Sequence, residues 1–287
     1  MIKKFKDYYQ LTKPGIIYGN AVTAIAGFLL ASQGHPRLGL FLATIVGLSL
    51  VIASGCVLNN YIDRDIDKKM ARTKNRALAI GLISERNAFV YAITLGVAGI
   101  FLLINYTNDL TTLIAIFGLF AYVVLYGIAK RKSVWGTVVG SISGAVPPVV
   151  GYLAVTNNFD LGAGLLFLIL VCWQMPHFYA IAIFRSKEYA SAAIPVLPIK
   201  KGLHHTQVQM VWYILAFTVS CLSLTLFGYT GYSYLIIMTI TCLLWLKRTI
   251  EGFRIKDSSA WARQVFGFSL VTLMVFSLMI SINNFLP

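Results

Sequence analysis

The sequence predicts an all-α polytopic membrane protein, a bundle of nine transmembrane helices around a central cavity that opens to the cytoplasmic side. Of its 287 residues, 58% are hydrophobic and only 12% are charged, about half the charged fraction of an ordinary soluble domain. The mean hydropathy is accordingly high, at +0.76. The apolar residues also fall into separate blocks long enough to cross a bilayer, which takes about 20 residues in a helix.

Nine such blocks follow one another and leave no room for a separate soluble domain. Residues 1–287 are therefore expected to form a single transmembrane domain. The first block lacks a small-residue cleavage site behind its basic N-terminus, so we expect it to remain as a helix. The eighth block is predicted to be short. The blocks cover approximately residues 15–33, 38–58, 87–105, 111–129, 134–155, 161–183, 206–228, 231–246 and 265–284.

Basic residues are distributed unevenly between the connections. The chain has 24 Lys and Arg, and if the N-terminus is placed inside, every one except Arg37 falls on that side. Because cytoplasmic connections are rich in Lys and Arg, this pattern predicts a cytoplasmic N-terminus and a C-terminus on the outside. The net charge of +14 is interpreted as a topology signal and as attraction to anionic lipid, and no nucleic-acid partner is expected.

The fifth and sixth blocks contain residues that shape helices. Glycines recur every four residues from Gly136, and this spacing lets helices approach closely. The Pro147–Pro148 pair predicts a broken helix, which is tolerated where the backbone lines a cavity. Pro176 predicts a kink in the sixth block. The four cysteines lie inside apolar blocks without a CxxC pair, and we interpret them as packing residues.

Asn59, Asp63 and Asp67 follow the second block at spacings of four residues. In a helix this spacing places three oxygen-bearing side chains on one face, whereas Asp65 points to another. Carboxylate oxygens at this spacing suit hard cations, and such cations in turn hold diphosphates. An ionisable cluster beside hydrocarbon is costly to keep, so this triplet is the first candidate site.

Basic side chains near the triplet could hold phosphate or carboxylate oxygens. The alternative is a solvated basic loop, and the neighbouring triplet favours the first interpretation. Tyr126 and Lys130 lie one helical turn apart where the fourth block ends. Arg64 is counted with the catalytic triplet. The candidates for substrate binding are Lys13, Lys68, Arg72, Lys74, Arg76, Tyr126, Lys130, Arg131, Arg185 and Lys187.

The connection after the sixth block is a second long polar stretch on the same side. His177 follows Pro176, and helical spacing continues from it to Arg185 and then Glu188, so the three can lie along one inward face. A histidine within a membrane span is either a ligand or a hydrogen-bonding partner of a neighbouring helix. The sequence leaves both interpretations open.

Several segments together resemble the UbiA-type intramembrane prenyltransferases. Residues 59–67 match the NxxxDxxxD pattern shared throughout that family. The other segments resemble the branch of the family that prenylates haem, and they fall in family order. They are Leu11–Pro14, Arg72–Arg76, Gly144–Pro148, Trp173–Phe178 and Ile194–Pro198.

The resemblance implies a Mg²⁺-dependent transfer of the farnesyl group from farnesyl diphosphate to a vinyl group of haem b, with addition of water, giving haem O and diphosphate. Asn59, Asp63 and Asp67 would hold the metal, and Glu188 stands where many members carry a second Asp-rich motif. With haem as the acceptor, we expect His177 to contact it. The resemblance also implies a bacterial inner membrane and a place near haem A synthase or terminal-oxidase assembly.

Other classes of protein share some of these features. A prenyltransferase acting on an aromatic quinone precursor would have the same donor site. A secondary transporter of an anionic solute would also have a basic face and broken helices, but its site would lie near the bilayer midplane. A CDP-alcohol phosphotransferase would carry an Asp-Gly dipeptide, and the chain has none. A haem-binding assembly factor would not need the triplet.

Overall fold

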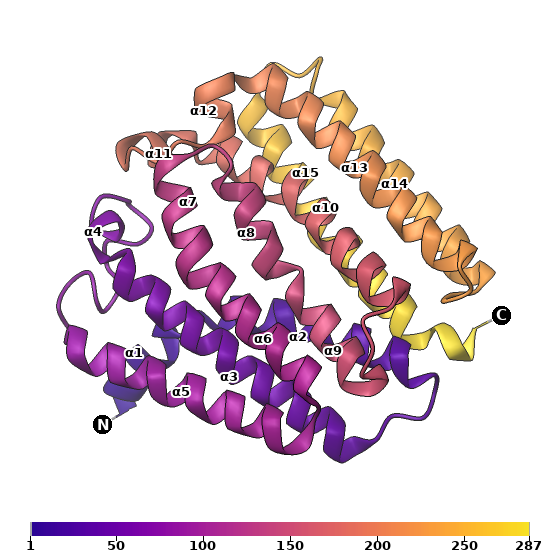
Figure 1. The fold of residues 1–287 in the computed structure, drawn as a ribbon. Helices are drawn as coiled ribbons and strands as arrows, with labels where there is room; N and C mark the ends of the chain where they lie inside the picture. Colours follow the sequence, from indigo (N-terminus) through magenta and orange to yellow (C-terminus); the bar gives the residue numbers. More distant parts are fainter. Residues whose placement is uncertain (1, 287) are drawn as a thin grey trace.

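The computed structural model describes residues 2–286, and every regular element in that range is a helix. Within this range nine spans are long and apolar enough to cross a membrane, which confirms the predicted number (Figure 1). They are α2 (Pro14–Ser32), α3 (Leu38–Ile62), α5 (Glu85–Tyr106), α6–η1–α7 (Asp109–Phe120, Ala121–Tyr126, Gly127–Lys132), α8–α9 (Gly136–Gly144, Val146–Thr156), α10 (Leu161–Phe184), α13 (Leu203–Leu226), α14 (Tyr232–Glu251) and α15 (Ser258–Ile282).

Short helices occupy the connections. In Figure 1, α4, α11 and α12 lie near one another at the end of the bundle where α7 leads into α8. Ser191 Oγ of α11 is 3.5 Å from the carbonyl oxygen of Lys69, just after α4. The two long polar connections therefore meet at one end of the molecule. The short helices are α1 (Ile2–Leu11), α4 (Arg64–Asp67), α11 (Ser186–Ser191), α12 (Leu197–Lys201) and η2 (Asn283–Phe285).

Two predicted span boundaries are wrong. The eighth block is predicted to end near residue 246, but α14 continues to Glu251 and has 20 residues. The ninth is predicted to start near residue 265, but α15 starts at Ser258. The additional turns carry basic residues such as Lys247 and Arg263. Long basic side chains let a helix extend past the hydrocarbon, because their charged ends reach the polar surface, and hydropathy does not register such turns.

The fifth span is broken at Ala145, between α8 and α9, as the proline pair predicts. Close packing of α9 on α2 depends on two glycines. A methyl group at Gly151 would lie 2.0 Å from the carbonyl oxygen of Ala24, and one at Gly27 would lie 2.1 Å from that of Pro148. The two backbones are therefore in direct contact, which is how helices without large side chains pack in membranes.

Helix α10 is the centre of the larger half of the core. Its buried residues point in all directions, as expected for a helix surrounded by others. It packs against α8, α13 and α15, and the largest buried cluster, which includes Phe217, Trp245 and Phe276, gathers around it. The helix continues through Pro176 without interruption. This places Gln174 and His177 in the middle of the molecule.

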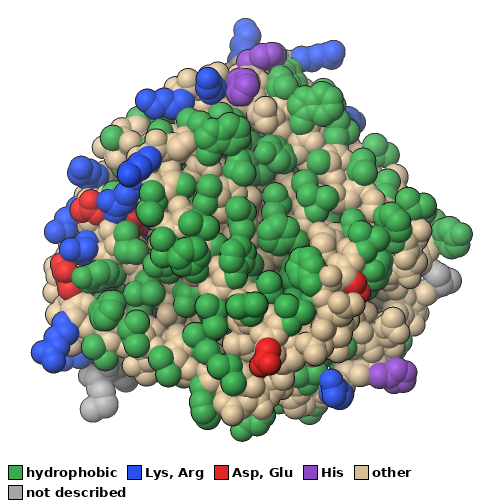
Figure 2. Space-filling model, viewed as in Figure 1, with side chains coloured by type: hydrophobic (Ala, Val, Ile, Leu, Met, Phe, Trp, Pro, Cys, Tyr) green, Lys and Arg blue, Asp and Glu red, His purple; other side chains and the backbone are tan. Residues whose placement is uncertain are grey.

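The surface separates basic from apolar side chains. In Figure 2, Lys and Arg gather along the left and upper edge of the molecule, the end that carries α4, α11 and α12. Apolar side chains cover most of the remaining face. A broad apolar belt with a basic rim at one end is what a multi-pass membrane protein presents to lipid.

Candidate active site

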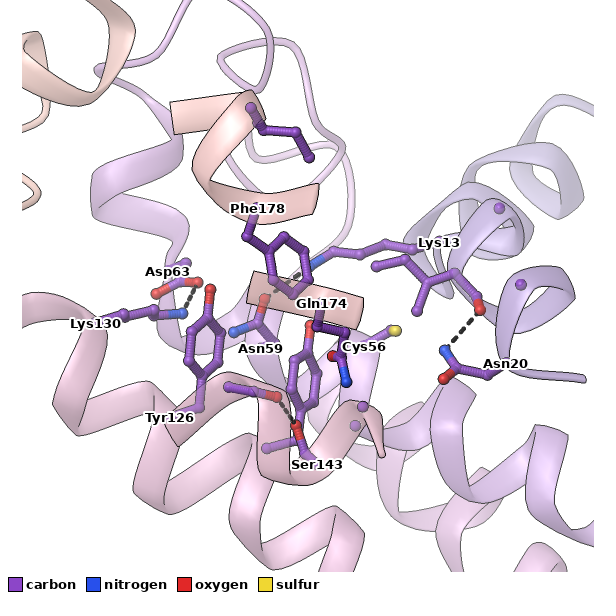
Figure 3. Close-up of a pocket in the computed structure, with 18 of the residues that line it drawn as sticks. Lys13, Asn20, Cys56, Asn59, Asp63, Tyr126, Lys130, Ser143, Gln174 and Phe178 are labelled. Carbon is purple, nitrogen blue, oxygen red and sulfur yellow. Dashed lines mark hydrogen bonds and ion pairs between the residues drawn. The ribbon is translucent and has the colours of Figure 1, made fainter. Parts of the chain in front are cut away.

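A cavity of about 1170 Å³ lies between the helices and is lined by segments from α1 to α15 (Figure 3). Charged and amide side chains from the α3–α4 region line one part of it. Leu48, Val51, Leu170 and Leu273 are among the apolar side chains that line another part. The cavity therefore combines a polar region suited to an anion with an apolar region suited to a hydrocarbon chain.

The triplet of Asn59, Asp63 and Asp67 does not lie on one continuous helix, so that prediction is wrong. Helix α3 ends at Ile62, and Asp63, with φ −92° and ψ 5°, joins it to the four-residue helix α4. The backbone nevertheless keeps helical hydrogen bonding across this break, because Asp63 N donates to Asn59 O at 2.9 Å and Asp67 N to Asp63 O at 2.8 Å.

All three side chains of the triplet are buried and line the cavity. Asp65, between them, is exposed. The common orientation follows from the preserved backbone hydrogen bonds, because residues four apart in a helical turn lie on the same side. The carboxylates of Asp63 and Asp67 and the amide oxygen of Asn59 thus face one space.

Basic side chains from distant segments bind both buried carboxylates. Asp63 pairs with Lys130 and Arg131 of α7, and Arg131 Nη2 is 3.2 Å from Asp63 Oδ1. Asp67 pairs with Arg76, whose Nη1 is 2.8 Å from Oδ2. Buried charges need such partners, since an unpaired one would be strongly destabilising. The segment 72–76 and helix α7 are therefore fixed around the triplet.

Lys13 contacts the triplet from the other side. Its ammonium donates to Asn59 Oδ1 at 2.7 Å, and burial lowers the pKa of this group to about 8. Its backbone adopts a left-handed conformation, with φ 55°, immediately before Pro14. Such a conformation is uncommon for a residue with a side chain and often occurs at functional sites. The conformation directs the chain from α1 into α2 beside the cavity.

The structure brings many of the residues predicted from the sequence to this cavity but not all of them. Those that line it are Lys13, Asn59, Asp63, Asp67, Arg72, Arg76, Tyr126, Lys130, His177 and Arg185. Those that do not are Arg64, Lys68, Lys74, Arg131, Lys187 and Glu188.

Two of the residues outside the lining have other partners. Arg64 Nε is 2.8 Å from Glu85 Oε1, and Arg185 Nη1 is 3.1 Å from Glu188 Oε1. The expected common face of His177, Arg185 and Glu188 does not extend to Glu188, because α10 ends at Phe184 and Glu188 lies on the separate helix α11. Glu188 therefore does not join the triplet in the cavity lining.

Several residues of the cavity were not predicted from the sequence. Tyr122 lies in the π-helical segment η1 and stacks on Tyr126, with ring centroids 5.7 Å apart and planes 10° apart. Lys130 Nζ lies 5.0 Å from the centre of the Tyr126 ring. The spacing of Tyr122, Tyr126 and Lys130 at steps of four could have revealed this row. Cys56, interpreted as a packing residue, is buried but also lines the cavity.

His177 lines the cavity from α10 and is buried. Its Nδ1 is 2.7 Å from Ser269 Oγ on α15. The imidazole stacks on Trp173, with centroids 4.7 Å apart, and approaches Phe266 at 4.8 Å. The hydrogen bond to Ser269 supports the helix-bridging interpretation, and it leaves the other ring nitrogen without a partner among the described residues. The two interpretations of this histidine are therefore compatible.

The helical bundle with a buried Asn/Asp triplet beside a mixed cavity defines an intramembrane prenyltransferase. The model of the UbiA prenyltransferase family matches residues 20–273, and the chain belongs to that family. Curated relatives named protoheme IX farnesyltransferase include those of Salmonella choleraesuis strain SC-B67, 51% identical over 99% of this chain and 96% of theirs, and of Sodalis glossinidius, 52% identical over 98% and 96%.

Solved structures share the fold at low sequence identity. A digeranylgeranylglyceryl phosphate synthase superimposes with a TM-score of 0.81 at 19% identity, covering 98% of this chain and 99% of that one. A UbiA homologue from Archaeoglobus fulgidus, bound to GPP and Mg²⁺, gives 0.63 at 12% identity, with coverage of 96% and 99%. These likenesses confirm the all-helical bundle architecture.

Proposed function

We propose that this protein transfers the farnesyl group of farnesyl diphosphate to a vinyl group of haem b, with addition of water, giving haem O and diphosphate. The observation that carries the proposal is the buried triplet of Asn59, Asp63 and Asp67 at a cavity that is part polar and part apolar. The full-length similarity to proteins named protoheme IX farnesyltransferase supports haem over a quinone precursor as the acceptor.

The residues of the triplet fit Mg²⁺. No group of three His, Cys, Asp or Glu residues suited to a metal occurs within the described chain, so a metal here would take two carboxylates, Asp63 and Asp67, and the amide oxygen of Asn59. Mg²⁺ is commonly held by one or two carboxylates together with substrate phosphates, and all three atoms are the hard oxygens it prefers. When bound, Mg²⁺ would neutralise the charge that develops on the leaving diphosphate.

Basic side chains around the triplet would orient the diphosphate. Lys13, Arg72 and Arg76 line the cavity, and Arg72 makes no ion pair with a carboxylate among the described residues. Preorganised cations stabilise negative charge most strongly where it grows in the transition state. The stacked rings of Tyr122 and Tyr126 present aromatic faces beside this region, which would stabilise an allylic cation.

Lys130 has a direct role in this proposal. Replacing it with alanine is expected to raise the KM for farnesyl diphosphate about tenfold, because a buried charge-assisted contact is lost near the anion. The matched control is Arg131→Ala on the same helix, which also pairs with Asp63 but lies outside the cavity lining. Steady-state kinetics with each substrate varied would measure both. Equal effects of the two substitutions would contradict a specific role for Lys130.

His177 would contact the acceptor. Optical titration of haem b into the wild-type protein and into His177→Ala is expected to show a shifted Soret band and at least about tenfold weaker binding in the variant, because imidazole is a common ligand of haem iron. Ser269→Ala, which removes the partner of Nδ1 and the hydrogen bond from Ser269 Oγ to Phe266 O but keeps the imidazole, should shift the band less. Identical spectra and affinities for wild type and His177→Ala would exclude the contact.

The polar end of the cavity would face the cytoplasm. The basic edge of the molecule supports this orientation through the positive-inside rule, with the N-terminus inside and the C-terminus outside. Homology to proteins from Salmonella and Sodalis supports a bacterial inner membrane. Reporter fusions at each terminus would test the topology.

Pigment analysis of cells that express the protein would test the function. Extracts are expected to contain a haem heavier than haem b by one farnesyl group and one hydroxyl group. Cells expressing Asp67→Ala should contain only haem b. A prenylated quinone precursor without any change in haem would favour the other acceptor class, and uptake of an anionic solute by vesicles without prenylation would favour a transporter.

A further inference from the structure

Gln174 of α10 lines the cavity but has no role in the reaction steps described above. Its side chain is 4% exposed. Its Nε2 donates to Ser141 O at 3.1 Å and to Leu170 O at 2.9 Å. Because both amide hydrogens are used, the orientation of the amide group is fixed, and so is the position of Oε1.

Oε1 of Gln174 accepts no hydrogen bond from any described residue. A methyl group at Gly144 would lie 2.0 Å from this oxygen, so only a glycine at that position leaves room for it. Both residues line the cavity, and Figure 3 shows the Gln174 side chain directed into it. Gln174 Oε1 is not one of the buried polar atoms that lack a partner among the described residues, so it is open to the cavity, where an amide oxygen can accept a hydrogen bond. Its presence at a cavity wall therefore points to a small ligand that donates a hydrogen bond.

Water is a small hydrogen-bond donor that these surroundings can hold. Leu170, Val146 and Pro147 contribute apolar lining to the same cavity, and no carboxylate precedes or follows Gln174 on α10. A buried water needs at least two polar partners. The second is Ser143, next to Gly144, whose hydroxyl donates to Gly140 O at 2.9 Å and keeps its lone pairs free to accept.

We propose that Gln174 Oε1 positions the water molecule that captures the haem-derived cation, an inference that rests on the proposed function. In that reaction the bond between farnesyl C1 and the diphosphate oxygen breaks, and a new bond forms between C1 and the terminal vinyl carbon. The positive charge then lies on the vinyl carbon attached to the porphyrin. The water oxygen bonds to that carbon, and the water proton passes to the released diphosphate.

The location of Gln174 agrees with this role. It precedes His177 by three residues, so both side chains lie on one side of α10 about 5–6 Å apart at their Cβ atoms. A haem held at His177 would bring its periphery to Gln174. Without a positioned water, the same cation would lose a proton from the neighbouring carbon to diphosphate and form an alkene, which is lighter than the alcohol by one water.

The ratio of alcohol to alkene products tests the proposal. Purified wild-type protein and Gln174→Met would be incubated with farnesyl diphosphate and haem b, and the farnesylated haems separated and weighed by mass spectrometry. The ratio is expected to fall about tenfold in the variant, the effect of one hydrogen bond that is lost. A role of Gln174 in structure alone would lower the total product without moving the ratio, and that result would overturn the proposal.

A second pair of variants keeps the test independent of the folding of Gln174→Met. Gly144→Ala must displace the Gln174 oxygen and should also lower the ratio. Gly140→Ala, one turn earlier on α8, presses instead on the Tyr126 ring, 2.9 Å away, and should leave the ratio unchanged while slowing turnover. An unchanged ratio in Gly144→Ala would overturn the water site. Absence of any farnesylated haem from the wild-type protein would instead overturn the proposed function.

Discussion

Replacing Asp67 with alanine is expected to reduce farnesyl transfer at least about 100-fold, because several kcal/mol of stabilisation of the leaving diphosphate would be lost. The same loss is expected for Asp63→Ala. Both carboxylates are buried, face the cavity and would share the metal with Asn59. The rate of diphosphate release from purified protein would measure the effect.

Asp65→Ala is the matched control for both substitutions. Asp65 lies between the two ligands in the chain, but it is exposed and contacts Arg131 at the surface. Exposed ion pairs contribute little, so the variant should retain most of its activity. Each variant must also remain folded in the membrane, because loss of the buried Asp67 leaves Arg76 without its carboxylate. An inactive Asp65→Ala together with an active Asp67→Ala would show that the metal lies elsewhere.

The largest expected effect on stability comes from Gly151. A methyl group there would meet the backbone oxygen of Ala24 at 2.0 Å, and a backbone atom cannot move aside as the end of a side chain can. We expect Gly151→Ala to destabilise the bundle by about 1–3 kcal/mol, the usual range for overpacking. A lower temperature of thermal unfolding in detergent would report it.

Gly164→Ala on α10 is the control, since nothing lies within 4 Å of the position its methyl group would take. This substitution should leave the unfolding temperature unchanged or raise it slightly, because alanine favours a helix by up to about 1 kcal/mol over glycine. If the two variants unfolded at the same temperature, close contact between α2 and α9 would not limit stability.

The sequence was sufficient to predict the number of spans, because apolar blocks of membrane length leave few alternative folds. The break before Pro147 was also predictable, because two consecutive prolines interrupt a helix. The lengths of α14 and α15 were not predictable in this way. A hydropathy profile limits the apolar span at basic residues such as Lys247 and Arg263, whereas the helices continue past these residues. Local composition therefore determines which segments cross the membrane more reliably than where each helix ends.

The candidate site was predictable where it depends on local spacing. Asn59, Asp63 and Asp67 follow from a periodicity of four in the sequence. Two other contacts of the site were not predictable: Asp67 pairs with Arg76, and Lys13 donates to Asn59. Each joins separate segments, and a local sequence pattern does not show how such segments are placed relative to each other. Gln174 was not predicted as a site residue for the same reason. The position of its amide oxygen depends on the space beside Gly144, which lies on another helix.

Haem b is expected to receive the farnesyl group in this cavity. The most direct measurement uses purified protein in lipid nanodiscs with Mg²⁺, farnesyl diphosphate labelled at C1, and either haem b or a 4-hydroxybenzoate acceptor. We predict that label will enter haem b, that chelating Mg²⁺ will stop the transfer, and that 4-hydroxybenzoate will remain unlabelled. Label in 4-hydroxybenzoate with none in haem b would contradict the claim.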